Sequence, residues 1–179
     1  MKSAQLLSDL RTMTQQHLVY VEELLDMPIA KLAHRPHSDR WNILENIEHL
    51  SLYSDFYLPE IDQAMAKSSS TAVEEFKSGW LGAYFVNAMI PGPESKKMKT
   101  FKDKDTIGHD LNKLCVERFA GQLRTTLTLL DRASKVDLNK VKTGITISKL
   151  VRIKLGDILR VVIYHNDRHM EQIKGIRKS

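Results

Sequence analysis

Cysteine is almost absent from this sequence of 179 residues, which contains only Cys115. A single thiol cannot form an internal disulfide, and without a Cys-x-x-Cys pair the chain cannot build a thiolate metal site or a dithiol redox centre. Any metal ion must therefore be bound through nitrogen or oxygen atoms. Cys115 itself is most simply interpreted as a small buried side chain.

Long apolar runs are also missing. Nowhere do eighteen consecutive apolar residues occur, and the first twenty residues have neither an apolar core nor a small-residue cleavage site of the kind found in signal peptides. We therefore expect a cytoplasmic protein with no membrane partner. The length and a hydrophobic content of 42% predict one folded domain spanning residues 1–179.

The charges show only a mild excess of one sign, with 27 lysines and arginines against 22 aspartates and glutamates. Basic residues gather at 95–104, 140–154 and 174–179, but no nucleic-acid motif or set of stacking aromatics accompanies them. Solvated loops and a helix end are the favoured interpretation. The alternative is that these basic residues bind anionic small molecules or nucleic acid, and nucleic acid is the less favoured of the two partners.

Hydrophobic periodicity predicts four long helices. Apolar residues recur every three or four positions in four segments, 4–25, 41–67, 110–133 and 156–177. Ser38 or Asp39 is the predicted N-cap of the second helix, and Pro59 is a point where that helix can bend. Irregular connections link the second predicted helix to the third and the third to the fourth. The first of these, 68–105, is the longer, and the other contains strand-like alternation at 141–147. This pattern predicts an all-α four-helix bundle with long crossover connections.

Two histidines, His165 and His169, lie inside the apolar stripe of the last predicted helix. Side chains four apart on a helix stand one above the other, so both imidazoles can reach one ion. The spacing alone is weak, because hydrogen-bonded core histidines show it too. Two buried imidazoles, however, need two separate partners, whereas one metal ion satisfies both. Asn166 follows His165, so the His-Glu-x-x-His motif of zinc proteases is absent.

His49 is the candidate for a third imidazole, because it stands in the mostly apolar second predicted helix. The remaining histidines have simpler interpretations. His17 lies on the apolar face of the first helix and is expected to be a hydrogen-bonded core residue. His34 and His37 belong to a solvated loop or a helix cap, and His109 precedes the third helix.

Two stretches resemble the DinB-like superfamily of damage-inducible and YfiT-type proteins. They are RPHSDRWNILENIEHL at 35–50 and KLGDILRVVIYHNDRHMEQIKGI at 154–176, with SKKMKTF at 95–101 between them. The resemblance covers nearly the whole chain, and this family is distinct from the DNA polymerase that shares the DinB name. It implies an up-down-down-up four-helix bundle, often dimeric, and hence a homodimer here. It also implies a divalent metal ion bound by His49, His165 and His169.

The resemblance further implies an enzyme, because family members include thiol-dependent S-transferases and isomerases, and others are labelled metal-dependent hydrolases. Three imidazoles leave one coordination position open, as in catalytic zinc sites. Zinc suits such ligands best, with nickel, iron and manganese as alternatives. We therefore expect a thiol S-transferase or hydrolase acting on a small molecule. For the S-transferase, a low-molecular-weight thiol is a candidate substrate. The alternative is a non-enzymatic, stress-related bundle that binds metal.

Catalytic side chains beyond the ion and its bound water are not evident from the sequence. Glu45 and Gln172 are candidates for orienting the imidazoles, although a solvent-facing carboxylate is the simpler interpretation of Glu45. Tyr53 and Asn166 can flank the site, but packing and surface exposure respectively are the favoured interpretations. Four residues in the long connection either cover the mouth of the pocket or pack on the surface: Trp80, Tyr84, Phe85 and Met89.

Overall fold

The computed structural model describes residues 1–90 and 100–178, apart from the side chain of Lys149. Most of this part of the chain forms four long helices, which confirm the four predicted segments with small shifts at their ends. They are α1 (Ser3–Leu25), α3 (Ile43–Ala66), α5 (Lys113–Ala133) and α6 (Leu155–Lys178). The shorter helices are α2 (Ile29–Leu32), α4 (Trp80–Met89) and the 3-10 turn η1 (Lys102–Lys104).

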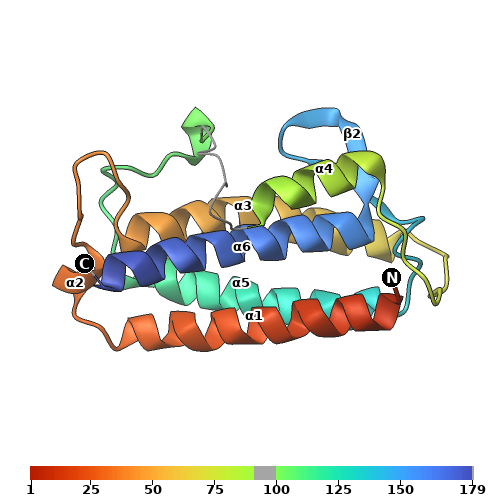
Figure 1. Cartoon of the computed structure of the whole chain (residues 1–179), viewed down its shortest axis with the longest axis horizontal. Helices are drawn as coiled ribbons and strands as arrows, with labels where there is room; N and C mark the ends of the chain where they lie inside the picture. Colours follow the sequence, from red (N-terminus) through yellow and green to blue (C-terminus); the bar gives the residue numbers. More distant parts are fainter. Residues whose placement is uncertain (91–99, 179) are drawn as a thin grey trace.

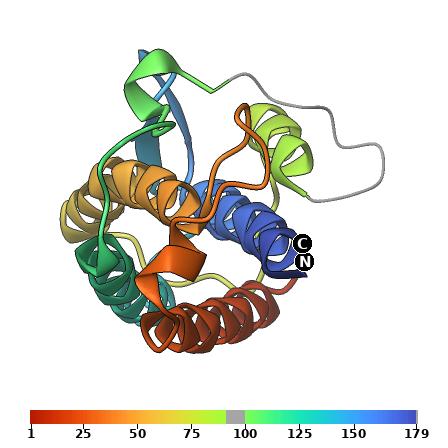
Figure 2. The same cartoon turned by 90° about the vertical axis from the view of Figure 1, so that its left-hand side faces the viewer.

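The four long helices pack side by side around a shared core (Figures 1 and 2). Helix α1 contacts α5 and α6, and α3 contacts the same two helices from the other side. The core contains two apolar clusters, one built around Leu10, Ile61 and Ile158 and the other around Ile47 and Phe119. Each cluster draws residues from all four long helices, so every helix buries its apolar stripe.

A polar layer separates the two apolar clusters. It receives side chains from each of the long helices, including Thr14 and His17 of α1, Ser51 of α3, Thr126 of α5 and Asn166 of α6, all of them buried. Burying polar groups costs free energy unless they find partners. The polar side chains therefore lie midway along the four long helices, where the three candidate histidines also lie.

Helix α3 begins one residue after Asn42, and the prediction that Ser38 or Asp39 caps it was wrong. The Asn42 side chain accepts a hydrogen bond from the Glu45 backbone at 2.8 Å, and the Glu45 carboxylate accepts one from the Asn42 backbone at 2.8 Å. This reciprocal pair satisfies two amides that the first helical turn leaves unpaired. The helix then continues through Pro59 to Ala66.

Helix α4 forms inside the connection that was predicted to be irregular. Gly82 allows close packing inside this helix, because a Cβ atom at this position would lie 2.2 Å from Oδ2 of Asp157. Asp157 of α6 also accepts hydrogen bonds from the Gly79 amide at 2.8 Å and from the Ser78 hydroxyl. The carboxylate thus fixes the N-terminal end of α4 against α6. The Pro-Gly-Pro sequence at 91–93 and half of the basic stretch at 95–104 lie outside the described residues.

A small antiparallel hairpin precedes α6. Strand β1 (Lys142–Ile145) lies within the predicted strand, whereas its partner β2 (Ser148–Lys154) was not predicted. The fold is therefore mainly helical, as predicted, with one small two-stranded sheet. Among the described residues, no helix is both long and apolar enough to cross a membrane.

Candidate metal centre

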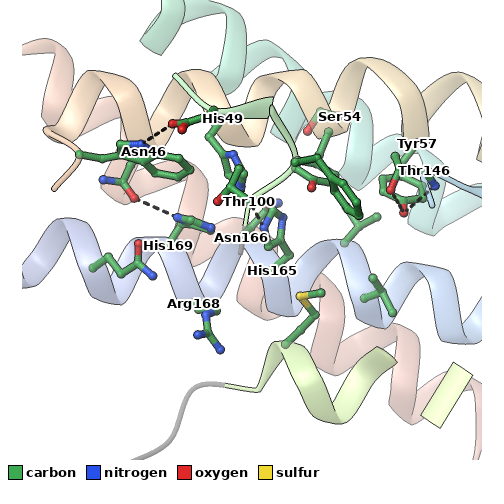
Figure 3. A pocket seen from close by; sticks show the side chains of 18 of the residues that line it. Asn46, His49, Ser54, Tyr57, Thr100, Thr146, His165, Asn166, Arg168 and His169 are labelled. Carbon is green, nitrogen blue, oxygen red and sulfur yellow. Dashed lines mark hydrogen bonds between the residues drawn. The ribbon is translucent and has the colours of Figure 1, made fainter. Parts of the chain in front are cut away.

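Three histidines meet where α3 and α6 lie side by side, at the level of the polar layer. His49 comes from the first half of α3, and His165 and His169 stand one turn apart on α6 (Figure 3). One nitrogen from each imidazole lies within 4.8 Å of the other two. These three side chains could therefore hold a metal ion, and the structure brings the histidine of the second long helix to the pair on the last.

The imidazoles face one another closely. The Nε2 atoms of His49 and His165 are 3.3 Å apart, and the ring centroids of the three histidines are separated by 4.7, 4.8 and 5.2 Å. His49 and His169 are buried, and His165 is half-buried. The cluster is thus largely enclosed by protein, and His165 is the most accessible of the three side chains.

The outer nitrogens of two of these imidazoles have fixed partners. Nδ1 of His49 donates to the backbone carbonyl of Lys104 at 2.8 Å, and Nδ1 of His169 donates to the side-chain oxygen of Asn46 at 2.9 Å. A neutral imidazole that donates through Nδ1 carries its lone pair on Nε2. The surrounding protein thus selects the tautomer that presents Nε2 to the centre of the cluster, as in metal sites with oriented histidines.

The three imidazoles are neutral near pH 7. Burial lowers the pKa of His49 to about 4, although the hydrogen bond to the Lys104 carbonyl opposes this effect. Burial and the neighbouring His49 lower the pKa of His165 to about 3. Burial, followed by His165 and His49, holds the pKa of His169 well below its ordinary value of 6.5. All three lone pairs are consequently free of protons and available to a cation.

Aromatic rings enclose the cluster. The Trp41 ring stacks against His169 with centroids 5.8 Å apart and contacts His49 at 4.5 Å. The Tyr53 ring lies 4.8 Å from His165 and 5.0 Å from His49. The Trp41 Nε1 group donates to Asp105 at 3.0 Å, which attaches the ring to the segment that carries the Lys104 carbonyl.

Glu45 is buried, and its carboxylate bonds to residues other than the imidazoles that it was expected to orient. Besides the Asn42 amide, its carboxylate accepts hydrogen bonds from Arg35 at 2.5 Å and from the Gly108 amide at 2.6 Å. These bonds attach two loops to the start of α3. Gly108 lies four residues after Lys104, whose carbonyl bonds to His49. Glu45 therefore supports the orientation of His49 indirectly, through this segment. The simpler interpretation of a solvent-facing carboxylate is wrong, since the side chain is 0% exposed.

Asn46 was missed as a site residue, although the sequence contains a signal for it. It stands three positions before His49, and positions three or four apart share a helix face. Asn166 was expected at the surface but is buried and lines the cavity. Gln172 also lines the cavity. A hydrogen bond between its side chain and His169 partly opposes the lowering of the His169 pKa. Tyr53 combines packing with a place in the cavity wall.

A cavity of about 1010 Å³ opens beside the histidines. Phe85 and Met89 of α4 form part of its wall, whereas Trp80 and Tyr84 of the same helix are 84% and 67% exposed. The four residues expected to act together are thus divided between the two faces of α4. The volume is sufficient for a small-molecule ligand.

The other singled-out residues lie outside the histidine cluster. His17 is buried in the polar layer and its Nε2 hydrogen-bonds to Asp167 at 3.0 Å, which confirms the prediction of a core imidazole. His37 is exposed and lines the cavity, and His109 is exposed before α5. Cys115 is buried, as predicted, and burial raises its pKa to about 11.

The fold and the cluster together define a class: a mainly helical protein in which two adjacent helices bring three neutral imidazoles to a point beside a large cavity, where they could hold a metal ion. A family model described as the DinB superfamily matches residues 7–173. The chain belongs to the DinB superfamily. No curated protein and no solved structure matches it.

Proposed function

We propose that this protein is a divalent-metal-dependent enzyme that acts on a small molecule, with His49, His165 and His169 as the metal ligands. The observation that carries the proposal is the convergence of three imidazole nitrogens, within 4.8 Å of one another, in the wall of a cavity of about 1010 Å³. The proposal includes an up-down-down-up order of the four long helices in one domain. The reaction class is thiol S-transfer or hydrolysis.

The donor set fits a divalent cation. Neutral imidazole nitrogens are good ligands for zinc and also accept nickel, iron and manganese. When bound, such an ion supplies Lewis acidity, which lowers the pKa of a thiol or water molecule and polarises a carbonyl group. Three protein ligands beside an open cavity resemble a catalytic centre, because structural zinc is normally enclosed by four protein ligands.

The chain's own residues hold this centre in place. The Lys104 carbonyl and Asn46 fix the tautomers of His49 and His169. Trp41 and Tyr53 cover the imidazoles and keep water from most of their surface. Because burial keeps the three pKa values low, protons do not compete with the cation near neutral pH.

The first test is the metal content of protein purified without chelator and without added nickel. We expect one divalent ion per chain, and loss of most of that ion after alanine substitution of His49, His165 or His169. His109→Ala is the matched control, because this histidine is exposed and lies outside the cluster. Full occupancy in the triple variant would contradict the proposal.

The second test separates an enzyme from a metal-stabilised scaffold. The loaded protein is assayed with low-molecular-weight thiols paired with electrophiles, and with small esters and amides. Turnover that disappears on chelation and returns with the ion supports the enzyme. Unfolding on chelation, together with no turnover on any substrate, favours a non-enzymatic metal-binding bundle.

A further inference from the structure

The cavity extends in two directions along α6 from the histidines, and the two arms differ in chemistry. Toward the N-terminus of α6, it follows Val162 and Ile158, three and seven residues before His165. Toward the C-terminus it follows Gln172, seven residues after His165. We call these the apolar arm and the polar arm. Figure 3 shows Asn46 of α3 on one side of the histidines and Ser54 and Tyr57 of the same helix on the other side.

The apolar arm has walls from four elements. Ile158 and Val162 belong to α6, Phe85 to α4, Tyr57 to α3 and Ile145 to β1. No charged side chain of the described residues lines this arm. Its far end is bounded by the hairpin, where the Tyr57 hydroxyl lies 3.1 Å from the Thr146 hydroxyl and accepts from the Thr146 amide at 3.3 Å. The polar groups at this end therefore already have partners, and the arm offers an apolar surface.

The polar arm carries charge. Arg40, His37 and Asp39 line it from the loop before α3, together with the apolar Ile176 of α6, whereas Arg168 lies on α6 between His165 and His169. A charged or strongly polar part of a ligand is better accommodated there, while apolar surface is better accommodated in the other arm. The histidines stand between these two environments.

We propose that the apolar arm binds an alkyl or aryl group of the substrate, whose reacting polar group lies at the histidines. This inference rests on the proposed function, because it places the reacting group at the metal ligands. His165 stands seven positions after Ile158 on the helix, which at 1.5 Å per residue corresponds to about 10 Å and admits a medium-length alkyl chain. The substrate class is thus an amphipathic small molecule rather than a fully hydrophilic one.

The experiment uses straight-chain alkyl hydroxamates, from acetohydroxamate to octanohydroxamate, titrated calorimetrically into the zinc-loaded protein. The head group binds the ion and the tail enters the apolar arm. Each buried methylene is expected to raise affinity about fourfold until the arm is filled. Equal affinity across the series, in protein shown to contain zinc, would overturn the inference and leave the proposed function standing.

A matched pair of hairpin variants tests the location of the tail. Ile147 lines the apolar arm and is 55% exposed, whereas Leu150 is 94% exposed and does not line it. Ile147→Asp is expected to reduce the octanoyl-to-acetyl affinity ratio at least tenfold, and Leu150→Asp is expected to leave this ratio unchanged. Equal effects of the two variants would also overturn the inference.

A second variant and a second probe keep the two proposals separate. Val162→Phe fills the arm from α6 and should flatten the dependence on chain length, whereas Val19→Phe, on the exposed face of α1, should not. If the protein binds no divalent metal ion, the proposed function fails, and butanol to octanol are then titrated into the metal-free chain. Affinity that rises with alcohol length in wild type but not in Val162→Phe supports the arm, and a flat series overturns it.

Discussion

Asn46 on α3 accepts a hydrogen bond from Nδ1 of His169 on α6, with the two atoms 2.9 Å apart. The pair joins two helices at positions that are 123 residues apart in the sequence. It determines which nitrogen of His169 faces His49 and His165. A site whose ligands come from two helices depends on such cross-helix contacts for its geometry.

Asn46→Leu is expected to lower zinc affinity by roughly 10- to 100-fold, because it removes the acceptor that fixes the His169 tautomer. Asn46→Asp retains an acceptor oxygen and should keep most of the affinity. Competition with a chromophoric chelator measures both values. Since Asn46 Nδ2 also donates to the Asn42 carbonyl at 2.9 Å, thermal unfolding of each variant is recorded alongside. Unchanged zinc affinity in Asn46→Leu would show that the tautomer is held by other means.

Acid should destabilise the metal-free protein through the buried histidines. The folded pKa values of His49 and His165 are about 4 and about 3, below the ordinary 6.5, so the unfolded chain binds more protons than the folded chain between these values. Stability therefore falls as pH is lowered from about 6.5 toward 4. The melting temperature, followed by circular dichroism in chelator over this range, measures the effect.

His165→Gln provides the control for the acid prediction, because glutamine does not titrate. Its melting temperature should depend less on pH between 6.5 and 4 than that of the wild-type chain. An identical dependence in the two proteins would locate the acid sensitivity elsewhere in the chain.

Glu45→Ala is expected to destabilise the fold by about 3 to 5 kcal/mol, because it leaves the partly buried Arg35 and the amides of Asn42 and Gly108 without their acceptor. Glu48→Ala is the matched control on the same helix. Glu48 pairs with Arg118 at 2.9 Å nearer the surface, where an ion pair contributes about 1 kcal/mol or less. Urea unfolding measures both changes, and equal losses would contradict the structural role given to Glu45.

Gly82→Ala should destabilise the protein by about 1 to 3 kcal/mol, because the added methyl group overlaps Asp157 and forces α4 away from α6. Gly121→Ala on α5 is the opposite case. Nothing lies within 4 Å of a Cβ atom at that position, so alanine should stabilise the helix by about 0.5 to 1 kcal/mol. Differential scanning calorimetry distinguishes the two signs, and a stabilised Gly82→Ala would refute the close packing of α4.

Cys115 should resist alkylation in the folded protein. Burial raises its pKa from 9.0 to about 11, which reduces the reactive thiolate roughly 100-fold at pH 8. Mass spectrometry after exposure to iodoacetamide is expected to show slow modification of the native chain and rapid modification in urea. Comparable rates in the two conditions would mean that the thiol is accessible in the folded state.

Much of the framework follows from local pattern. The spacing of apolar residues predicted the four long helices, since a helix must bury one continuous face. The same spacing placed His165 and His169 inside the stripe of α6, one turn apart. The prediction of the α3 cap was wrong because three positions within one short segment all carry side chains able to cap a helix: Ser38, Asp39 and Asn42.

Other features arise from contacts that local pattern does not contain. Helix α4 depends on Gly82 lying against Asp157, which is distant in the chain. Glu45 was selected from its place beside His49, but its partner Gly108 belongs to a loop beyond the next helix. Strand β2 forms because β1 supplies its hydrogen-bonding partner.

By itself, the sequence determined the helices, the exclusion of thiolate chemistry and the pair of histidines on one helical face, because each is a property of composition or of residues within a few turns. Tertiary structure decided that His49 meets this pair, that a distant backbone carbonyl and Asn46 orient the imidazoles, and that the cavity has one apolar and one charged arm. Periodicity reports that a side chain is buried, but the identity of its neighbour depends on which helices pack together and in which register.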